Sequence, residues 1–370
     1  RLAESEASYR RALQIRPDFV EAHNSLGNTL KDLGRLVEAE ASCRRALEIK
    51  PDFAAAHSNL GNALQGLGRL EEAVASYRRA MEINPDFVDA HHNLIFTIDL
   101  SENYSVSDQQ AERRRWYEQH GQRFAGAIKP HDNLPDPERR LRIGFVSADF
   151  RQHSAYYIFS PIILCHDRSA FDVVCYSGVK VEDDCTARLR QAAHEWRSTL
   201  GLSDEALAEQ IRRDRIDILV DLSGHTAGNR LLVFARKPAP VQVTAWGYAT
   251  GTGLETIDYF LADPVVVPQE ERSLYAEEVV DLPCFVCFEP PEYLPEVSAL
   301  PALNDRELTF GCINRVEKIS ERVIRLWGRI LAALPEARLQ IKGSGLDDPE
   351  QRRRFAGRLE GAGIGAERVR

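Results

Sequence analysis

The sequence is poor in methionine and lysine, and it contains no long uninterrupted apolar run. Its 370 residues include one methionine and seven lysines, and the net charge is −9. No apolar stretch approaches the ~18 residues that a membrane-spanning helix needs, so we expect no membrane partner. General nucleic-acid binders are usually basic, so the negative charge argues against a nucleic-acid partner. With 44% hydrophobic residues, the chain can still form buried cores.

The cysteines form no evident disulfide framework. Cys284 and Cys287 make a C-x-x-C pair, but Phe285, Val286 and Phe288 around them are typical of a strand, and no second Cys or His pair follows. The pattern therefore favours packing, and we expect no metal site. All seven cysteines are scattered along the chain, which indicates free, buried thiols in a protein of the reducing cytoplasm. The other five are Cys43, Cys165, Cys175, Cys185 and Cys312.

The first hundred residues repeat with a period of 34. The triplet Pro-Asp-Phe occurs three times, first at Pro17, and the Ala-His pairs that follow coincide when the copies are aligned. This period resembles the tetratricopeptide repeat (TPR), a pair of antiparallel helices. Gly34 and Gly68 fall between the paired helices, where the chain must reverse. The pattern predicts an α-helical solenoid over residues 1–100.

Two asparagines share one position of the repeat. Asn59 and Asn93 lie on the helices that line the concave side of such arrays, where stacked amides can bind a peptide backbone. We predict that they bind protein acceptors, unless the array is only a spacer. Arg1 falls within a helix of the pattern and Arg370 within an αβ pattern, so we interpret the chain as a fragment with further repeats before Arg1.

The hydrophobic period changes after a link over residues 101–140. A charged helix is expected at 106–128, and a polar, proline-containing stretch follows it. Short β-branched runs then alternate with helical stretches, which predicts a mostly parallel, doubly wound sheet over residues 141–303. The expected strands are 141–146, 171–176, 216–222, 241–246, 259–267 and 278–282. Residues 304–370 begin a second Rossmann-like domain, which is incomplete.

Polar residues follow several of these strands. Ligands of such sheets bind beyond the carboxyl ends of the strands. The residues found there are His153, His225, Gly251, Thr252, Asn314, Arg315 and Lys318. We expect them to meet at one rim and in the cleft between the two domains. No G-x-G-x-x-G follows the first strand and no Walker lysine loop occurs, which disfavours dinucleotide-binding and P-loop proteins.

The ordered motifs resemble those of the TPR-containing O-linked N-acetylglucosamine transferases and their SPINDLY-like bacterial relatives. The matching stretches include Gly144-Phe-Val-Ser-Ala-Asp-Phe with His153, Leu219-Val-Asp-Leu-Ser-Gly-His-Thr, Trp246-Gly-Tyr, and Asn314 with Lys318-Ile-Ser. The resemblance implies a GT-B fold of two Rossmann-like domains facing a cleft. It also implies inverting, metal-independent transfer of N-acetylglucosamine from UDP-GlcNAc to Ser or Thr of protein acceptors recognised by the TPRs, without a cofactor.

The resemblance also implies roles for individual residues. His153 is expected near the sugar and the acceptor, and His225 either positions a substrate or braces its loop. Which of the two is the general base stays open, since a water chain or a donor phosphate oxygen could take the proton. Lys318 is expected on the donor diphosphate. The full donor-binding set expected is Lys318, Arg315, Asn314, Gly251 and Thr252.

The sequence is compatible with more than one donor and more than one role. Arg315 stands where relatives carry glutamine or asparagine, so it either adds a diphosphate contact or alters which nucleotide fits. Fucose from GDP-fucose is a second donor to consider. A non-catalytic TPR scaffold with a decayed GT-B part is also compatible with the sequence, and so is transfer to a small molecule or glycan.

TPR arrays of this family can pair through their convex faces, so a homodimer is considered as well. The later nucleotide-sugar segment is expected beyond Arg370, so residues 1–370 alone are expected to be inactive.

Overall fold

The computed structural model describes residues 2–288, 290, 293–300, 302–303, 307–343 and 346–370. The chain divides into two compact units, one of Arg1–Asn103 with Pro295–Arg370 and one of Tyr104–Leu294. The expected boundary between residues 303 and 304 falls beside residues 304–306, which lie outside the described ranges. In the described parts of the chain, no helix is long and apolar enough to cross a membrane.

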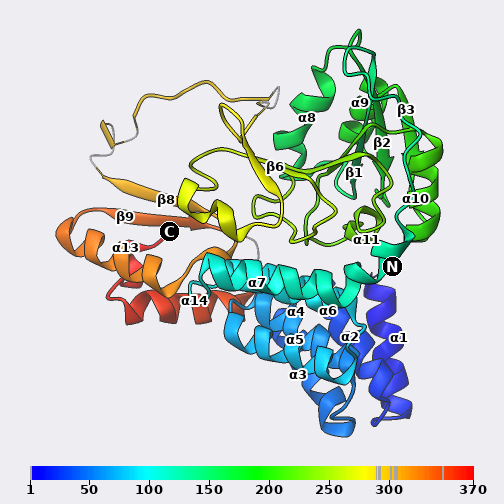
Figure 1. The fold of residues 1–370 in the computed structure, drawn as a ribbon. Helices are drawn as coiled ribbons and strands as arrows, with labels where there is room; N and C mark the ends of the chain where they lie inside the picture. Colours follow the sequence, from blue (N-terminus) through cyan, green and yellow to red (C-terminus); the bar gives the residue numbers. More distant parts are fainter. Residues whose placement is uncertain (1, 289, 291–292, 301, 304–306, 344–345) are drawn as a thin grey trace. The chain divides into compact units, whose positions relative to one another are not determined.

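Six helices form the repeat array that the 34-residue period predicts (Figure 1). They are α1 (Leu2–Ile15), α2 (Val20–Asp32), α3 (Leu36–Ile49), α4 (Ala54–Gly66), α5 (Leu70–Ile83) and α6 (Val88–Leu100). The first helices of successive repeats are α2, α4 and α6, and they begin at equivalent repeat positions. The predicted TPR solenoid is therefore confirmed.

Two kinds of glycine explain how these helices reverse and pack. Gly34 and Gly68 lie between paired helices with φ of +78° and +74°, a left-handed conformation that favours glycine. Gly61 lies inside α4, where an added Cβ would come within 2.6 Å of the ring of Tyr77. Tyr77 is fully buried, so the close approach of α4 and α5 depends on the missing side chain.

The repeated prolines lie in the turns before the first helices. Pro17 precedes α2, and its carbonyl oxygen lies 2.9 Å from Nε2 of His23. Pro51 and His57 repeat the same contact at 2.9 Å in the next unit. The recurring Ala-His pair therefore has a structural role in these two repeats, because the imidazole fixes the turns that lead into α2 and α4.

The segment after the repeats is helical, but it is not one α-helix as the sequence predicts. α7 (Val106–Trp116) continues as a π-helical turn, η1 (Tyr117–Gly121), and a 3-10 helix, η2 (Gln122–Ala127). A Cβ at Gly121 would lie 2.6 Å from Cδ2 of Tyr117. Glycine thus provides the space that the wider turn requires.

A seven-stranded sheet forms the centre of the second unit (Figure 1). In spatial order its strands are β3 (Glu195–Ser198), β2 (Phe171–Ser177), β1 (Leu141–Ser147), β4 (Ile218–Asp221), β5 (Val241–Thr244), β6 (Tyr259–Ala262) and β7 (Glu278–Asp281). The helical elements between them are α8 (Tyr156–Leu164), α9 (Asp184–Ala192), α10 (Asp204–Arg213), α11 (Leu231–Phe234) and the 3-10 helix η3 (Gln269–Leu274). Every neighbouring pair of strands is parallel, which confirms the predicted α/β fold.

β3 and β6 differ most from the sequence-based prediction, while β4 and β5 are shorter than expected by three and two residues. β3 was not expected, because its four residues are largely polar and lie at the edge of the sheet. β6 ends at Ala262 instead of residue 267. There the carboxylate of Asp263 accepts hydrogen bonds from the backbone N–H groups of Val265 and Val266, at 2.9 and 2.8 Å, and so turns the chain out of the strand.

The C-x-x-C pair lies in an irregular segment after β7, so its expected placement in a strand is wrong. Phe285 is buried there, while Cys284 is exposed and Cys287 is half-buried. All seven cysteines are free, but the expectation that they are all buried is also wrong. Cys43 and Cys175 are the buried ones, and burial raises the pKa of both thiols.

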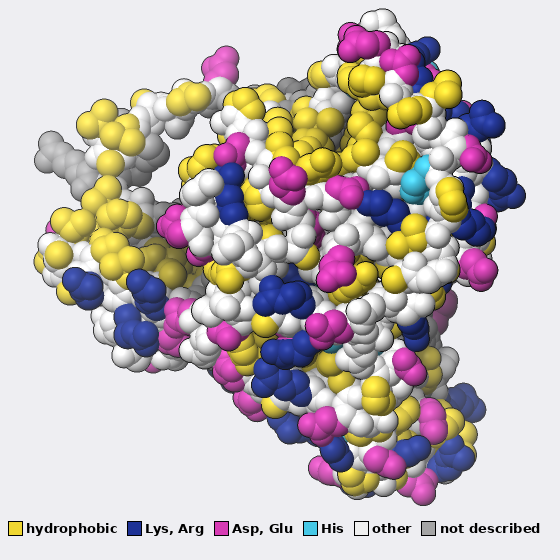
Figure 2. All heavy atoms as spheres, viewed as in Figure 1, with side chains coloured by type: hydrophobic (Ala, Val, Ile, Leu, Met, Phe, Trp, Pro, Cys, Tyr) yellow, Lys and Arg dark blue, Asp and Glu magenta, His cyan; other side chains and the backbone are white. Residues whose placement is uncertain are grey.

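The first unit also contains a small parallel sheet of β8 (Thr309–Ile313) and β9 (Arg338–Lys342). The helical elements around it are α13 (Glu321–Ala333), α14 (Pro349–Gly361) and the 3-10 turns η4 (Val316–Lys318) and η5 (Ala366–Arg368). Ile324, Leu339 and Phe355 belong to the core between the helices and the sheet. The side chain of Ile313 is 85% exposed, and Figure 2 shows hydrophobic side chains gathered over this sheet. The segment alternates parallel strands with helices, which is a Rossmann-like pattern.

This small sheet and the repeats pack together within the first unit. The side-chain amide of Gln351 on α14 donates a hydrogen bond of 3.0 Å to the carbonyl of Gly66 at the end of α4. An added Cβ at Gly68 would lie 3.8 Å from Cα of Glu317 in η4. The turn that carries Lys318 therefore lies beside a repeat turn.

Candidate active site

Three loops meet at the carboxyl ends of β1, β4 and β5. An added Cβ at Gly228, after β4, would lie 2.8 Å from Cβ of Ala148, after β1. One at Gly224 would lie 2.8 Å from Cβ of Tyr248, after β5. β1 and β4 are neighbours in the sheet, and the chain order reverses between them. Ligands of doubly wound sheets bind at such a switch point, so these loops form the candidate site of the second unit.

His153 lies on the loop after β1, and its side chain is 39% exposed. Its Nδ1 accepts a hydrogen bond of 3.3 Å from the backbone N–H of Ala155 and lies 3.7 Å from a carboxylate oxygen of Asp149. Because Nδ1 accepts, a neutral ring carries its proton on Nε2 and presents a donor there. A hydrogen bond of 2.7 Å from the backbone N–H of Gln152 to the carboxylate of Asp183 fixes this loop.

His225 lies on the loop after β4 and is only 1% exposed. Its Nε2 lies 2.8 Å from the carbonyl oxygen of Thr252. The rings of His225 and Trp116 pack edge to face, with centroids 5.1 Å apart and an interplanar angle of 84°. In this geometry His225 joins the loop after β4 to the loop after β5, which is what a bracing residue does.

The glycine loop after β5 is Tyr248–Gly253, and hydrogen bonds hold it to the rest of the protein at Thr250 and Thr252. Gln110 of α7 donates a hydrogen bond of 2.8 Å to the carbonyl of Thr250, and Arg113 donates one of 2.7 Å to the Thr250 hydroxyl. Gly251 has φ of +69°, which favours glycine. Thr252 is buried, and its backbone N–H and carbonyl are both bonded inside the protein.

Two buried carboxyl groups support these loops, and neither was predicted as a site residue. Asp221 accepts hydrogen bonds from the backbone N–H groups of Ser223 (3.1 Å) and Gly224 (2.9 Å). Burial raises its pKa to about 6. Glu277 accepts from the backbone N–H of Thr252 at 2.6 Å, and burial raises its pKa as well. Asp221 ends a strand within one of the family motifs, whereas Glu277 precedes a strand and carries no sequence signal.

The predicted donor-binding residues of the first unit follow β8. The Asn314 side chain accepts a hydrogen bond of 2.9 Å from the backbone N–H of Arg315, and the Arg315 guanidinium lies 3.3 Å from Glu317. Lys318 is exposed, and its ammonium group has no ion pair with the residues that the structure describes. It ends η4 just before Ser320, whose side chain caps the N-terminus of α13. A cation beside a helix N-terminus is suited to a phosphate group.

Asn59 and Asn93 occupy equivalent half-buried positions on α4 and α6. The side-chain amide of Asn59 donates a hydrogen bond of 2.8 Å to the Asn24 side chain of the preceding repeat. Asn24 was not expected in this row. The bond links the asparagines of two successive repeats on α2 and α4, and peptide binding by Asn59 and Asn93 stays a prediction.

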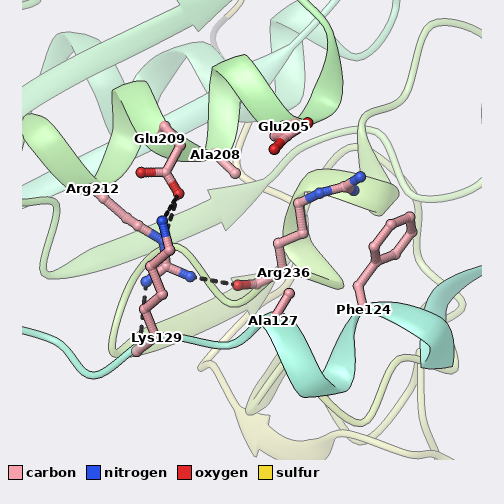
Figure 3. A pocket seen from close by; sticks show the side chains of 8 residues that line it. All are labelled: Phe124, Ala127, Lys129, Glu205, Ala208, Glu209, Arg212 and Arg236. Atoms are coloured by element: carbon pink, nitrogen blue, oxygen red, sulfur yellow. Dashed lines mark hydrogen bonds and ion pairs between the residues drawn. The ribbon is translucent and has the colours of Figure 1, made fainter.

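A surface pocket of about 230 Å³ lies on the second unit, lined from η2, α10 and the turn after α11 (Figure 3). Its cations are already engaged. Lys129 pairs with Glu209 at 2.6 Å, Arg212 donates to the carbonyl of Arg236 at 2.7 Å, and the Arg236 guanidinium lies 3.6 Å from the Phe124 ring centroid. This pocket includes none of the predicted site residues.

Metal binding has no support in the part of the chain that the structure describes. No group of three or more His, Cys, Asp or Glu side chains there could hold a metal ion. The metal independence of the reaction stays a prediction.

The chain combines a helical repeat array with parallel Rossmann-like sheets, an architecture found among repeat-bearing glycosyltransferases. The chain belongs to glycosyl transferase family 41, whose model matches residues 84–288. Tetratricopeptide-repeat models match residues 1–34, 20–53 and 54–87. The resemblance inferred from the motifs is therefore confirmed.

Similar proteins support this family assignment. A mutant O-GlcNAc transferase from Thermobaculum terrenum has 39% sequence identity and a TM-score of 0.92, and the match covers 100% of this chain and 70% of that chain. The probable UDP-N-acetylglucosamine–peptide N-acetylglucosaminyltransferase SPINDLY of Arabidopsis thaliana is 40% identical over 243 residues, which are 64% of this chain and 27% of that protein. The UDP-N-acetylglucosamine–peptide N-acetylglucosaminyltransferase of Caenorhabditis elegans is 32% identical over 176 residues, 46% of this chain and 15% of that protein. The matches thus span about a quarter or less of these two longer relatives.

Proposed function

We propose that the protein is an inverting, metal-independent O-glycosyltransferase that transfers N-acetylglucosamine from UDP-GlcNAc to Ser or Thr of protein acceptors. The observation that carries the proposal is Lys318, which lies before the N-terminus of α13 without an ion pair to the described residues, in a chain 39% identical to a solved O-GlcNAc transferase. A diphosphate leaving group needs such positive charge when no metal supplies it.

The transfer needs one bond to form and one to break. The acceptor hydroxyl oxygen attacks the anomeric carbon from the side opposite the diphosphate, and the bond from that carbon to the diphosphate oxygen breaks. UDP then leaves with the electron pair of that bond. Lys318, with the N–H groups at the start of α13, neutralises the charge that develops on the diphosphate.

His153 suits an orienting role in this reaction. Its Nδ1 is occupied by the backbone N–H of Ala155, so its Nε2–H donates to an oxygen of the sugar or the acceptor. The proton of the acceptor then goes to a water chain or to a donor phosphate oxygen. His225, which is buried against Thr252, holds the neighbouring loops in place.

The proposal includes recognition of acceptors by the repeats and a location in the reducing cytoplasm. The asparagine pair Asn24–Asn59 supports peptide binding along the array, because amide groups bind peptide backbones without regard to side chains. Seven free cysteines support a reducing compartment. Pairing of two arrays through their convex faces stays a prediction.

The proposal is tested with the complete natural protein, a host lysate and either UDP-GlcNAc or GDP-fucose. The mass added to Ser or Thr of lysate peptides is then measured. An N-acetylhexosamine increment is expected. A deoxyhexose increment would move the protein to a fucosyl donor, and no increment with either donor would favour a non-catalytic scaffold.

A further inference from the structure

Glu277 is a buried residue whose carboxyl group accepts hydrogen bonds from Thr252 of the glycine loop. The residue lies just before β7, and its side chain is buried, with 3% of the residue exposed. Its Oε1 accepts hydrogen bonds from both the backbone N–H of Thr252, at 2.6 Å, and the Thr252 hydroxyl. Two bonds from one carboxyl to one residue fix both the backbone and the side chain of Thr252.

The opposite side of the same residue is held by His225. The carbonyl oxygen of Thr252 lies 2.8 Å from Nε2 of His225, so the imidazole donates through Nε2. Thr252 therefore lies between Glu277 and His225, and a shift of its peptide groups would move both the loop after β5 and the imidazole after β4.

The fit around the carboxyl is close. An added Cβ at Gly251 would lie 2.8 Å from Cδ1 of Tyr275 and 3.1 Å from Oε2 of Glu277. Within the described residues, Oε2 has no hydrogen-bond partner. A buried carboxyl with one unsatisfied oxygen is unfavourable for folding, so a stabilising core residue would be apolar. An apolar residue at this position could not accept the two hydrogen bonds that Oε1 of Glu277 accepts from Thr252.

We propose that Glu277 is a positioning residue, which sets the conformation of the loop Tyr248–Gly253 and, through Thr252, the orientation of His225. The effect on turnover rests on the proposed function. Glu277 is buried beneath the loop and is not placed to touch a substrate. It acts through Thr252, and the loop it fixes packs against Gly224 through Tyr248 at the candidate site.

The test compares three variants of the complete protein. Glu277→Ala removes the acceptor and leaves two buried donors of Thr252 without a partner. Glu277→Gln keeps an oxygen at the position of Oε1. Glu278→Gln is the matched control, because Glu278 is the adjacent glutamate in the sequence and its side chain is exposed at the start of β7. Hydrogen exchange of residues 248–254 and the kinetics with UDP-GlcNAc are measured for each.

For Glu277→Ala we expect faster exchange in residues 248–254 with unchanged exchange in β1 and β2. We also expect a fall of about 10²-fold in kcat/KM that is expressed mainly in the KM for the donor, because a displaced loop binds the donor poorly. Glu277→Gln should stay within about threefold of the wild type, because its carbonyl oxygen still accepts from Thr252.

Two results would overturn the proposal. One is wild-type exchange of residues 248–254 in Glu277→Ala, and the other is a loss in Glu277→Gln as large as in Glu277→Ala. A wild-type protein that transfers neither sugar would contradict the proposed function, while the exchange data would still decide the role of Glu277.

Discussion

The carboxylate of Asp221 accepts a hydrogen bond of 2.9 Å from the hydroxyl of Thr244, which joins the ends of the neighbouring strands β4 and β5. The same side chain accepts from the backbone N–H groups of Ser223 and Gly224. Asp221 is buried and thereby shapes the turn that leads to His225. Because this acid is buried, we expect the stability of the protein to depend on pH.

The stability of the protein should depend on pH through Asp221. Burial raises its pKa from the ordinary 3.8 to about 6, so the folded state binds the proton more tightly than the unfolded chain does. The free energy of unfolding therefore falls as the pH rises from 3.8 to about 6, by roughly 3 kcal/mol from this site. Urea unfolding of the wild type and of Asp221→Asn over this range isolates the contribution.

Asp221→Asn should be less stable than the wild type at low pH, because the amide cannot accept all three hydrogen bonds. Its deficit should shrink as the pH rises, since Asn does not ionise. The same pH dependence in both proteins would show that the carboxyl of Asp221 does not titrate in this range.

Substitutions of His225 should separate a bracing role from a catalytic one. His225→Gln keeps an N–H donor for the carbonyl of Thr252, whereas His225→Leu leaves that buried carbonyl unsatisfied. We expect His225→Leu to lower the free energy of unfolding by about 1–3 kcal/mol and His225→Gln to lower it by less. Urea unfolding and the turnover of both variants are the measurements. If His225→Gln kept full stability but lost transfer, His225 would act on the substrate directly.

Two glycine-to-alanine substitutions in helices of the first unit should have opposite signs. At Gly61 the new methyl group would lie 2.6 Å from the Tyr77 ring, so Gly61→Ala should destabilise the array by about 1–3 kcal/mol. Gly357 is exposed in α14 with nothing within 4 Å of the added Cβ. There the better helix propensity of alanine should stabilise the protein by about 0.5–1 kcal/mol. Thermal unfolding of both variants measures the difference, and equal signs would contradict the packing described for α4.

The fold could be predicted where the sequence is periodic. The 34-residue period indicated the repeats, with Gly34 and Gly68 in their expected left-handed turns, and β-branched runs indicated six strands of the large sheet. β3 was missed because a short polar edge strand has no apolar pattern. The single helix expected at 106–128 was wrong beyond Trp116, because the change to a π-helical turn depends on local packing at Gly121.

The candidate site could be predicted only in part. The position of His153 and His225 after strands followed from the rule for parallel sheets. The burial of His225 could not be predicted, because it depends on Trp116 and Thr252, which the fold brings from other segments. Glu277 was missed because it precedes its strand, so the rule does not point to it.

The central claim is that Lys318 serves sugar transfer from a nucleotide donor. The most direct measurement is the release of UDP from UDP-GlcNAc by the complete protein with acceptor proteins, in the wild type, Lys318→Ala and Lys50→Ala. Lys50 is an exposed lysine of the repeats and serves as the matched control. We expect Lys318→Ala to abolish release with unchanged thermal stability, since the side chain makes no ion pair with the described residues, and Lys50→Ala to behave as the wild type. Release by Lys318→Ala at the wild-type rate would contradict the central claim.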